Sequence, residues 1–215
     1  MSELSTWTAE AGVLQGAVLS PLLSNAYLNP LDHEMSAKGF QMVRHADDFV
    51  ILCRTELEAE AALSEVRVWV EAAGLSLHPD KTHIVDSREK SFAFLGYSFR
   101  ERLRFPREKS HRKVIDRIVE PTPRKSGDSL ECMITRINRS LRGWFNYFRH
   151  CIWNIFGEYD SMIRRRLRRM LLKRNRKNPK RIPGNQRWPN SFFTDHGLYS
   201  LREAHVRFVQ STGTY

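Results

Sequence analysis

The sequence has few cysteines and no long apolar run. Its three cysteines, Cys53, Cys132 and Cys151, are far apart, and none has a partner at the short spacing that zinc sites use. No apolar stretch approaches the roughly 20 residues that span a bilayer. The first residues also lack the basic-then-apolar order of a secretory leader. We therefore predict a cytoplasmic protein with no membrane partner, whose reduced thiols pack as small core residues.

Acidic residues are missing from one long stretch. No Asp or Glu occurs in residues 161–194, and 11 of the 18 residues in 164–181 are Lys or Arg. Residues 1–100 carry 8 Lys and Arg against 14 Asp and Glu, whereas residues 101–215 carry 27 against 10. This asymmetry indicates that the second half binds a polyanion while the first half binds cations or carries the catalytic residues. Solvated surface charge is the simpler alternative.

The first hundred residues predict helices around a hairpin. In residues 19–37, apolar side chains recur at spacings of three and four; Ser20 is the expected N-cap, and Pro30 should kink or split the helix. Residues 40–54 place two apolar runs around a polar centre, which predicts a hairpin with Asp47 and Asp48 at its tip. A second amphipathic helix should follow over residues 56–73. Short strands are then expected over residues 75–77, 82–85 and 92–99.

Basic helices are predicted from about residue 105. Apolar residues recur every three to four positions from Leu130 to Phe148, which is a strong helical stripe. Residues 175–190 are rich in Pro, Asn and Arg and predict a loop or linker, followed by a last short helix over residues 199–209.

Asp47 and Asp48 are the residues that point most directly to chemistry. Two adjacent carboxylates between hydrophobic strands are costly unless a cation neutralises them. Carboxylate oxygens suit Mg²⁺, which takes waters and substrate phosphates as its other ligands, and two such ions can stabilise an in-line displacement. The residues alone leave open that both are ordinary turn residues, because Asp favours turns.

Four ordered blocks resemble those of reverse transcriptases. Residues 44–50, RHADDFV, are similar to the Tyr-Ala-Asp-Asp signature, with His45 in place of Tyr. Upstream, residues 12–25, GVLQGAVLSPLLSN, resemble the Gly-x-Pro-Gln-Gly-Gly block and the helix start after it. Residues 74–82 and 94–97 match two later blocks in order and spacing. Residues 142–149, RGWFNYFR, resemble the maturase-specific region of group II intron proteins, so the resemblance covers about residues 9–175.

The resemblance to group II intron reverse transcriptases and maturases implies RNA-directed DNA synthesis coupled to intron RNA binding, splicing and retrohoming. It implies an α+β fold, in which a partial palm is an antiparallel sheet with packed helices and an all-α thumb and maturase domain follows. The expected ranges are 1–104 for the palm, 105–180 for the thumb and maturase domain, and 181–215 for a linker and short helix. The implied partners are group II intron RNA and an RNA template with a DNA primer.

The resemblance also implies roles for single residues. Asp47 and Asp48 would bind the catalytic Mg²⁺ ions. The nucleotide and template would be contacted by Gln15, Gly16, His45 and Lys81, and the primer end would be supported by Phe94, Leu95 and Gly96. His45 and Lys81 have structural alternatives, as a satisfied histidine beside a strand and a lysine stem packed on the sheet.

The candidates for RNA binding are cations and aromatic rings of the basic half. Tyr147 and Trp188 are expected to be free to stack on unpaired bases, whereas Trp144 and Phe148 lie on the apolar stripe and are expected in the core. The full set of RNA-binding candidates is Arg136, Arg139, Arg142, Tyr147, Arg164, Arg165, Arg168, Arg169 and Lys173.

The sequence departs from the family pattern near the expected active site. Leu14 stands where Pro is usual, Ala17 where Gly is usual, and His45 where Tyr is usual. The family's third metal-binding aspartate would lie upstream of residue 1, and Asp32 does not match it by motif. We therefore expect a truncated or split copy with little polymerase activity alone, which a separate N-terminal fragment or a homodimer would complete. A non-catalytic intron RNA-binding splicing factor and a host-domesticated DNA-binding protein are the alternatives.

Overall fold

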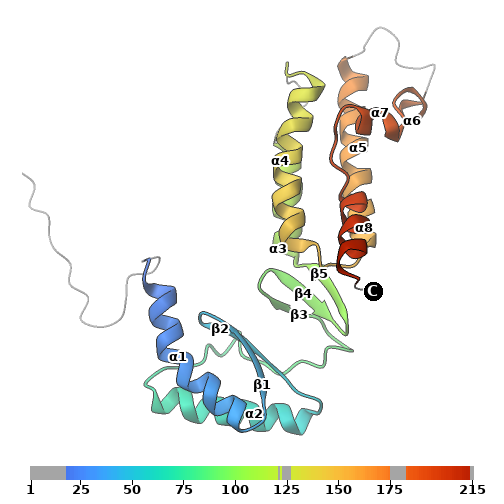
Figure 1. Cartoon of the computed structure of the whole chain (residues 1–215). Helices are drawn as coiled ribbons and strands as arrows, with labels where there is room; N and C mark the ends of the chain where they lie inside the picture. The colour runs from blue at the N-terminus through green and yellow to red at the C-terminus, as the bar shows by residue number, and fades with distance from the viewer. Residues whose placement is uncertain (1–17, 121, 123–126, 175–182, 214–215) are drawn as a thin grey trace, which may run out of the picture. The chain divides into compact units, whose positions relative to one another are not determined.

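The chain divides into two compact units, which we call the hairpin unit (Met1–Asp86) and the helical unit (Ser87–Tyr215). The structure is a computed structural model that describes residues 18–120, 122, 127–174 and 183–213 (Figure 1). Helices are mixed with two small antiparallel sheets, one in each unit, as expected for an α+β protein.

The hairpin unit packs one face of a two-stranded sheet against two helices. Its elements in order are α1 (Ser20–Ala37), β1 (Gln41–His45), β2 (Asp48–Leu52) and α2 (Glu56–Ala72). The strands pair antiparallel, in a register that runs from Gln41↔Leu52 to His45↔Asp48. Alternate strand residues therefore face the helices, where Met42, Phe49 and Ile51 pack on a core made by Leu31, Met35, Ala62, Val66 and Val70.

Helix α1 differs from the prediction at its start. Leu19, not Ser20, is the N-cap, and Ser20 is already the first helical residue. Pro30 does not split the helix, which is continuous to Ala37, although the ribbon changes direction partway along (Figure 1). A proline removes one intrahelical hydrogen bond and crowds the preceding turn, so a bend within a continuous helix is the expected outcome.

The strands predicted at residues 75–77 and 82–85 are not formed. Helix α2 ends at a left-handed Gly74 (φ 69°), and the backbone N–H of Leu75 donates to the Val70 carbonyl over 2.9 Å. The Thr82 N–H donates to the His78 carbonyl over 3.0 Å in the following turn. Because local bonds satisfy this backbone, the short apolar runs pack as a loop without a sheet partner.

The helical unit begins with a three-stranded meander of β3 (Phe92–Phe94), β4 (Tyr97–Arg100) and β5 (Leu103–Pro106). The range 92–99 is therefore two strands and not one, and β5 lies where basic helices were expected to begin. Leu95 and Gly96 join β3 to β4 with φ angles of 47° and 81°. A two-residue hairpin loop with positive φ at both positions suits the twist of the strands, and this loop divides the apolar run.

Three long helices follow: α3 (Glu108–Val119), α4 (Leu130–Phe148) and α5 (Asn154–Arg174). The apolar stripe predicted on α4 is confirmed, because Ile134, Ile137, Leu141, Trp144 and Phe148 are all buried. They form one core with residues of α3 and α5, including Val114, Ile118, Ile163 and Leu167. The N-terminus of α4 is capped by Ser129, whose side chain accepts from the Cys132 N–H.

The C-terminal segment folds back onto α4 and α5. It contains α6 (Gly184–Arg187), α7 (Asn190–Asp195) and α8 (Leu201–Thr212). Part of the predicted linker is thus helical, since α6 lies within residues 175–190; residues 175–182 lie outside the described part. The predicted last helix is confirmed as α8, which begins two residues later and ends three residues later than predicted. The buried carboxylate of Asp160 on α5 accepts hydrogen bonds from the N–H groups of Leu201 (3.0 Å) and Arg202 (3.2 Å) at the start of α8.

The three cysteines have different surroundings. Cys151 is buried, and burial raises the pKa of its thiol to about 12. Cys53 is half-buried in the hairpin unit, as predicted for a small core residue. Cys132 is exposed, against the prediction, with its Sγ 3.3 Å from an Arg136 guanidinium nitrogen. Among the described residues, no helix is long and apolar enough to cross a membrane.

Candidate active site and nucleic-acid interface

The tip of the β1–β2 hairpin carries both candidate catalytic aspartates. Ala46 and Asp47 form the turn, with Ala46 in a left-handed conformation (φ 55°), and Asp48 is the first residue of β2 opposite His45. Both carboxylates are exposed, and within the described part of the chain neither takes part in an ion pair. The predicted hairpin is therefore confirmed, with its adjacent carboxylates open to solvent.

The side chain of Arg44 stabilises this turn through hydrogen bonds. One guanidinium nitrogen donates to the Ala46 carbonyl over 2.8 Å and to the Asn25 side-chain oxygen over 2.9 Å. The rest of the guanidinium binds the Asp32 carboxylate of α1, with 2.8 Å between Nε and Oδ1. Asp32 raises the pKa of Arg44, and the Arg44 side chain is only 9% exposed. The turn is thus tied to α1 through a nearly buried, permanently charged side chain.

Asp47 and Asp48 are the hairpin residues that could hold a metal ion. Their exposed oxygens fit Mg²⁺, which often binds through one or two carboxylates and completes its shell with waters and phosphates. Asp32 is the carboxylate of α1 nearest in the hydrogen-bond network, but Arg44 already holds it. Across the residues that the structure describes, no group of three or more His, Cys, Asp or Glu side chains gathers as a metal site.

The residues predicted to contact nucleotide and template are only partly described. Gln15 and Gly16 lie outside the described residues. His45 is exposed at the end of β1, beside Asp48 in the register. Lys81 is exposed in the turn after α2, where its N–H donates to the His78 carbonyl over 3.2 Å. Lys81 is thus accessible from solvent, and its role stays a prediction.

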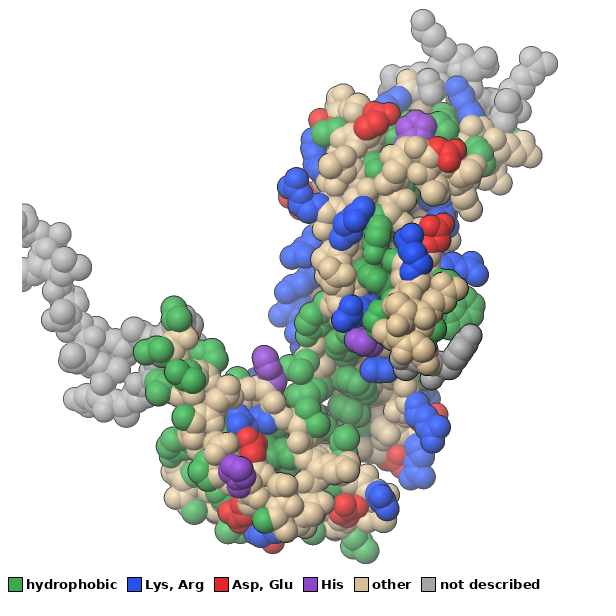
Figure 2. Space-filling model, viewed as in Figure 1, with side chains coloured by type: hydrophobic (Ala, Val, Ile, Leu, Met, Phe, Trp, Pro, Cys, Tyr) green, Lys and Arg blue, Asp and Glu red, His purple; other side chains and the backbone are tan. Residues whose placement is uncertain are grey.

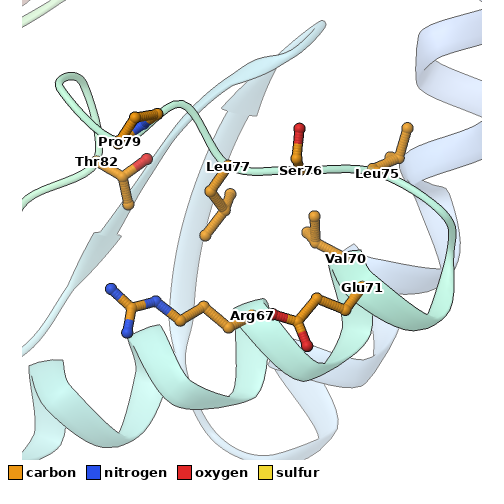
Figure 3. Close-up of a pocket in the computed structure, with 8 residues that line it drawn as sticks. All are labelled: Arg67, Val70, Glu71, Leu75, Ser76, Leu77, Pro79 and Thr82. Atoms are coloured by element: carbon orange, nitrogen blue, oxygen red, sulfur yellow. The ribbon is translucent and has the colours of Figure 1, made fainter.

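A shallow pocket lies next to the Lys81 turn, between α2 and the loop that follows it. Figure 3 shows Arg67 and Glu71 of α2 on one side and residues of the loop on the other. The loop contributes the hydroxyls of Ser76 and Thr82 to the lining, with Leu75, Leu77 and Pro79. This side of the hairpin unit thus presents a guanidinium, two hydroxyls and a neighbouring ammonium, all of which can bind phosphate oxygens.

The predicted primer-supporting residues lie in the helical unit, at the β3–β4 turn. Their backbone is fixed from three sides: the Gly96 carbonyl accepts from Ser110 Oγ (3.0 Å) and from the Arg107 N–H (2.9 Å), and the Leu95 carbonyl accepts from the Tyr147 hydroxyl (2.7 Å). Tyr97 donates in turn to the Tyr147 carbonyl, and the two rings stack with centroids 5.7 Å apart. The turn is a rigid feature docked on α3 and α4.

The basic helices present many of the predicted cations to solvent. Figure 2 shows Lys and Arg side chains gathered over the helical unit. The exposed members of the predicted set are Arg136, Arg139, Arg142, Arg165, Arg169 and Lys173. Arg142 also lies over the Tyr199 ring at 5.0 Å, and Arg136 pairs with Asp128 at 2.7 Å. These cations remain accessible to a polyanion while some of them also contact the protein.

Arg168 has a structural role that the charge pattern did not reveal. Its Nε donates to the Trp188 carbonyl over 2.8 Å, a second nitrogen donates to the Asn190 side chain over 2.7 Å, and its guanidinium lies over the Phe193 ring. Burial lowers its pKa. Arg164 is likewise only 19% exposed and lies 4.0 Å from the buried carboxylate of Asp160. Arg168 thus holds the C-terminal segment on α5, and Arg164 pairs with a carboxylate of its own helix.

The expectation for the aromatic rings is only partly met. Trp144 and Phe148 are in the core, as predicted. Trp188 is also buried, at 7% exposure, so the prediction that it is free for stacking is wrong; α6 and Arg168 hold it against α5. Tyr147 is 53% exposed, but its hydroxyl is committed to the Leu95 carbonyl. The sequence interpretation missed Trp153, which is 60% exposed and precedes a helix rather than lying on a stripe.

Comparison with known proteins assigns both units. A family model described as reverse transcriptase (RNA-dependent DNA polymerase) matches residues 2–99, and one described as group II intron, maturase-specific domain, matches residues 92–188. Protein YkfC of Escherichia coli (strain K12) is 29% identical over 168 aligned positions, which cover 61% of this chain and 43% of YkfC. The chain thus spans less than half the length of that curated relative.

The two matches define a protein in which a reverse transcriptase region runs directly into a maturase-specific region. They overlap only at residues 92–99 and together span residues 2–188. The chain therefore belongs to the group II intron family of reverse transcriptases and maturases.

Proposed function

We propose that this chain acts in RNA-directed DNA synthesis and in intron splicing, with the two tasks divided between its units. The hairpin unit corresponds to part of a polymerase palm, and the helical unit to a thumb and maturase domain that binds group II intron RNA. The observation that supports this most directly is the tight hairpin that holds Asp47 and Asp48 side by side and exposed, braced by Arg44. A site for phosphoryl transfer needs carboxylates that are accessible and fixed.

In this proposal, Mg²⁺ bound at Asp47 and Asp48 would neutralise charge on the transferred phosphate. The chain's own residues then have positioning tasks. Arg44 holds the turn through the Ala46 carbonyl, and His45, beside Asp48, faces the incoming nucleotide. The rigid β3–β4 turn, with Phe94, Leu95 and Gly96, supports the primer end, and Lys81 contacts phosphate. The RNA template and DNA primer are the substrates.

The second task, RNA binding, is supported by the charge of the helical unit. Cations exposed on α4 and α5 attract phosphates and release condensed counterions on binding, so affinity should fall steeply with salt. Retrohoming is also part of this proposal, because it follows when DNA synthesis and RNA binding act on the same intron. The chain would then belong to a mobile element.

A non-catalytic role as an intron RNA-binding splicing factor is favoured by one specific observation. No third carboxylate joins Asp47 and Asp48 among the described residues, and Arg44 occupies Asp32. Two carboxylates underfill a two-metal site, so we expect this chain alone to polymerise weakly or not at all. A separately supplied N-terminal fragment, or a second copy of the chain, would be needed to complete the site.

Primer extension on an RNA template with Mg²⁺ tests the catalytic proposal. The purified chain is compared with its Asp47→Asn, Asp48→Asn variant, alone and with an added N-terminal reverse transcriptase fragment, and RNA affinity is measured in parallel. Synthesis that depends on the two aspartates supports the polymerase, and synthesis that rises more than linearly with protein concentration indicates a homodimer. Binding of intron RNA without DNA synthesis under any of these conditions would favour the role as a splicing factor over the role as a polymerase. Tighter binding of duplex DNA than of structured intron RNA, at matched salt, would contradict both.

A further inference from the structure

An exposed tryptophan stands at the corner between α4 and α5. Trp153 is 60% exposed, whereas Trp144 and Trp188 of the same unit are each 7% exposed. The corner itself is well fixed: the Ile152 N–H donates to the Arg104 carbonyl of β5 over 3.0 Å, and the Phe156 N–H donates to the Trp153 carbonyl over 3.2 Å. A large aromatic ring held out from a rigid corner is suited to contact with a ligand.

One guanidinium lies beside this ring, and two more lie near the same corner of the chain. Arg202 of α8 lies 5.8 Å from the centre of the Trp153 ring. Arg149, at the end of α4, lies 4.8 Å above the Phe208 ring of α8. Arg104 and Arg149 both act electrostatically on His150, whose pKa is lowered by burial first and then by these two charges. We call the group of Arg104, Arg149, Trp153 and Arg202 the Trp153 surface. It combines one aromatic face with three cations.

The Trp153 surface is organised before any ligand arrives. The buried Asp160 carboxylate accepts from the Arg202 N–H and from the Ser200 hydroxyl (2.8 Å), which fixes the start of α8 on α5. The rings of Phe156 and His205 stack with centroids 4.7 Å apart one turn further along α8. Arg202 is therefore presented beside Trp153 by the core of the unit, and little order is lost when it engages a phosphate.

We propose that the Trp153 surface binds an unpaired nucleotide of RNA. The base stacks on the Trp153 indole, and Arg104, Arg149 and Arg202 contact the phosphates on either side of it. Base pairs inside a duplex hide their faces between neighbouring pairs, so an exposed indole stacks preferentially on a base that is unpaired. The three cations give this surface the charge complementary to the RNA backbone. This inference rests on the proposed RNA binding and adds to it a site for single-stranded segments.

The test measures the affinity of the full chain for a single-stranded RNA and for a duplex RNA of equal length at several salt concentrations. Trp153→Ala should weaken binding of the single strand by about 5- to 30-fold and leave its salt dependence unchanged, because stacking is uncharged. Trp153→Phe should retain most of the affinity. Arg202→Gln should instead reduce the slope of log K against log salt by about 0.7, which is the effect of one lost phosphate contact on a single strand.

Val206→Ala is the matched control, since this exposed α8 side chain is apolar and lies outside the Trp153 surface. It should bind both RNAs as the unmodified chain does. Unchanged single-strand affinity in Trp153→Ala, or an equal loss for single strand and duplex, would overturn the inference while the proposed RNA binding stands. Failure of the unmodified chain to bind any RNA would overturn both.

Discussion

Arg44 and Asp32 form a two-point ion pair that joins the β1–β2 hairpin to α1: the Arg44 Nε lies 2.8 Å from one carboxylate oxygen of Asp32 and 3.1 Å from the other. The same guanidinium reaches the carbonyl of Ala46, the residue before Asp47. A planar fork with several donors can hold the carboxylate and the turn together, which a lysine ammonium cannot do in one geometry. The conformation of the turn and the position of α1 are thereby coupled.

We predict that Arg44→Ala lowers the free energy of unfolding of the hairpin unit by about 2–3 kcal/mol, because it strands a carboxylate and two neutral acceptors. Arg44→Lys should recover only part of this loss. Urea denaturation followed by circular dichroism measures both variants. Lys38→Ala is the control: it breaks an exposed ion pair with Glu34 and Glu65 in the same unit and should shift the midpoint little. Equal shifts in Arg44→Ala and Lys38→Ala would contradict the coupling.

The position of Asp47 and Asp48 at a hairpin tip could be predicted from sequence because its determinants are local. Apolar alternation on both sides of Asp47 and Asp48 defines a hairpin, and its register is set by the two-residue turn. Arg44 could not be assigned its role in this way. Its partners, Asn25 and Asp32, lie on a helix 19 and 12 residues away, and periodicity says nothing of which side chains meet across two elements.

The β3–β4 turn gives a second prediction. Tyr147→Phe removes the hydroxyl that donates to the Leu95 carbonyl but keeps the ring that stacks on Tyr97. The expected loss is about 1 kcal/mol of the free energy of unfolding, the usual worth of one neutral hydrogen bond. Thermal denaturation of the full chain detects it. Tyr27→Phe is the matched control, because it removes a hydroxyl that donates to the Ala73 carbonyl in the hairpin unit. It tests whether a loss of this size is confined to the unfolding transition of the unit that carries the substitution.

A third prediction concerns the carboxylate that caps α8. Asp160→Ala leaves the N–H groups of Leu201 and Arg202 and the Ser200 hydroxyl without their acceptor in a buried place. We expect a loss of about 3 kcal/mol, since these are hydrogen bonds to a charged group. Amide hydrogen exchange in residues 198–212 should accelerate more than exchange in α4. Glu158→Gln, on an exposed position of α5, should change neither quantity.

The limits of sequence interpretation are clearest on α5. Its arginines look alike in a run of cations, and the sequence interpretation assigned Arg164, Arg165, Arg168 and Arg169 to RNA. In the structure, Arg168 binds the returning C-terminal segment, and Arg164 lies 4.0 Å from the buried Asp160 carboxylate of α5 itself. Arg166 donates to the carbonyls of Val119, the last residue of α3, and of Thr122 just beyond it. Their division between structure and surface depends on where residues 183–213 and the end of α3 pack, which no local pattern specifies. Trp188 was misplaced for the same reason.

The packing of α8 should depend on pH through two histidines. His205 stacks on Phe156, and His150 meets the Phe208 ring edge-on at 5.2 Å. Burial lowers the pKa of both, and Arg104 and Arg149 lower that of His150 further. Well above pH 6.5 both imidazoles are neutral in the folded and unfolded chain. As the pH falls below 6.5, the unfolded chain takes up protons before the folded chain, so the free energy of unfolding decreases.

We therefore expect a lower melting temperature of the helical unit at pH 5.5 than at pH 7.5. His205→Phe keeps an aromatic ring on Phe156 but cannot take up a proton, so the difference in melting temperature between the two pH values should shrink. His33→Gln, which alters an exposed histidine on α1 of the other unit, should leave the difference as it is. An unchanged pH difference in His205→Phe would show that protonation of His205 does not oppose the docking of α8.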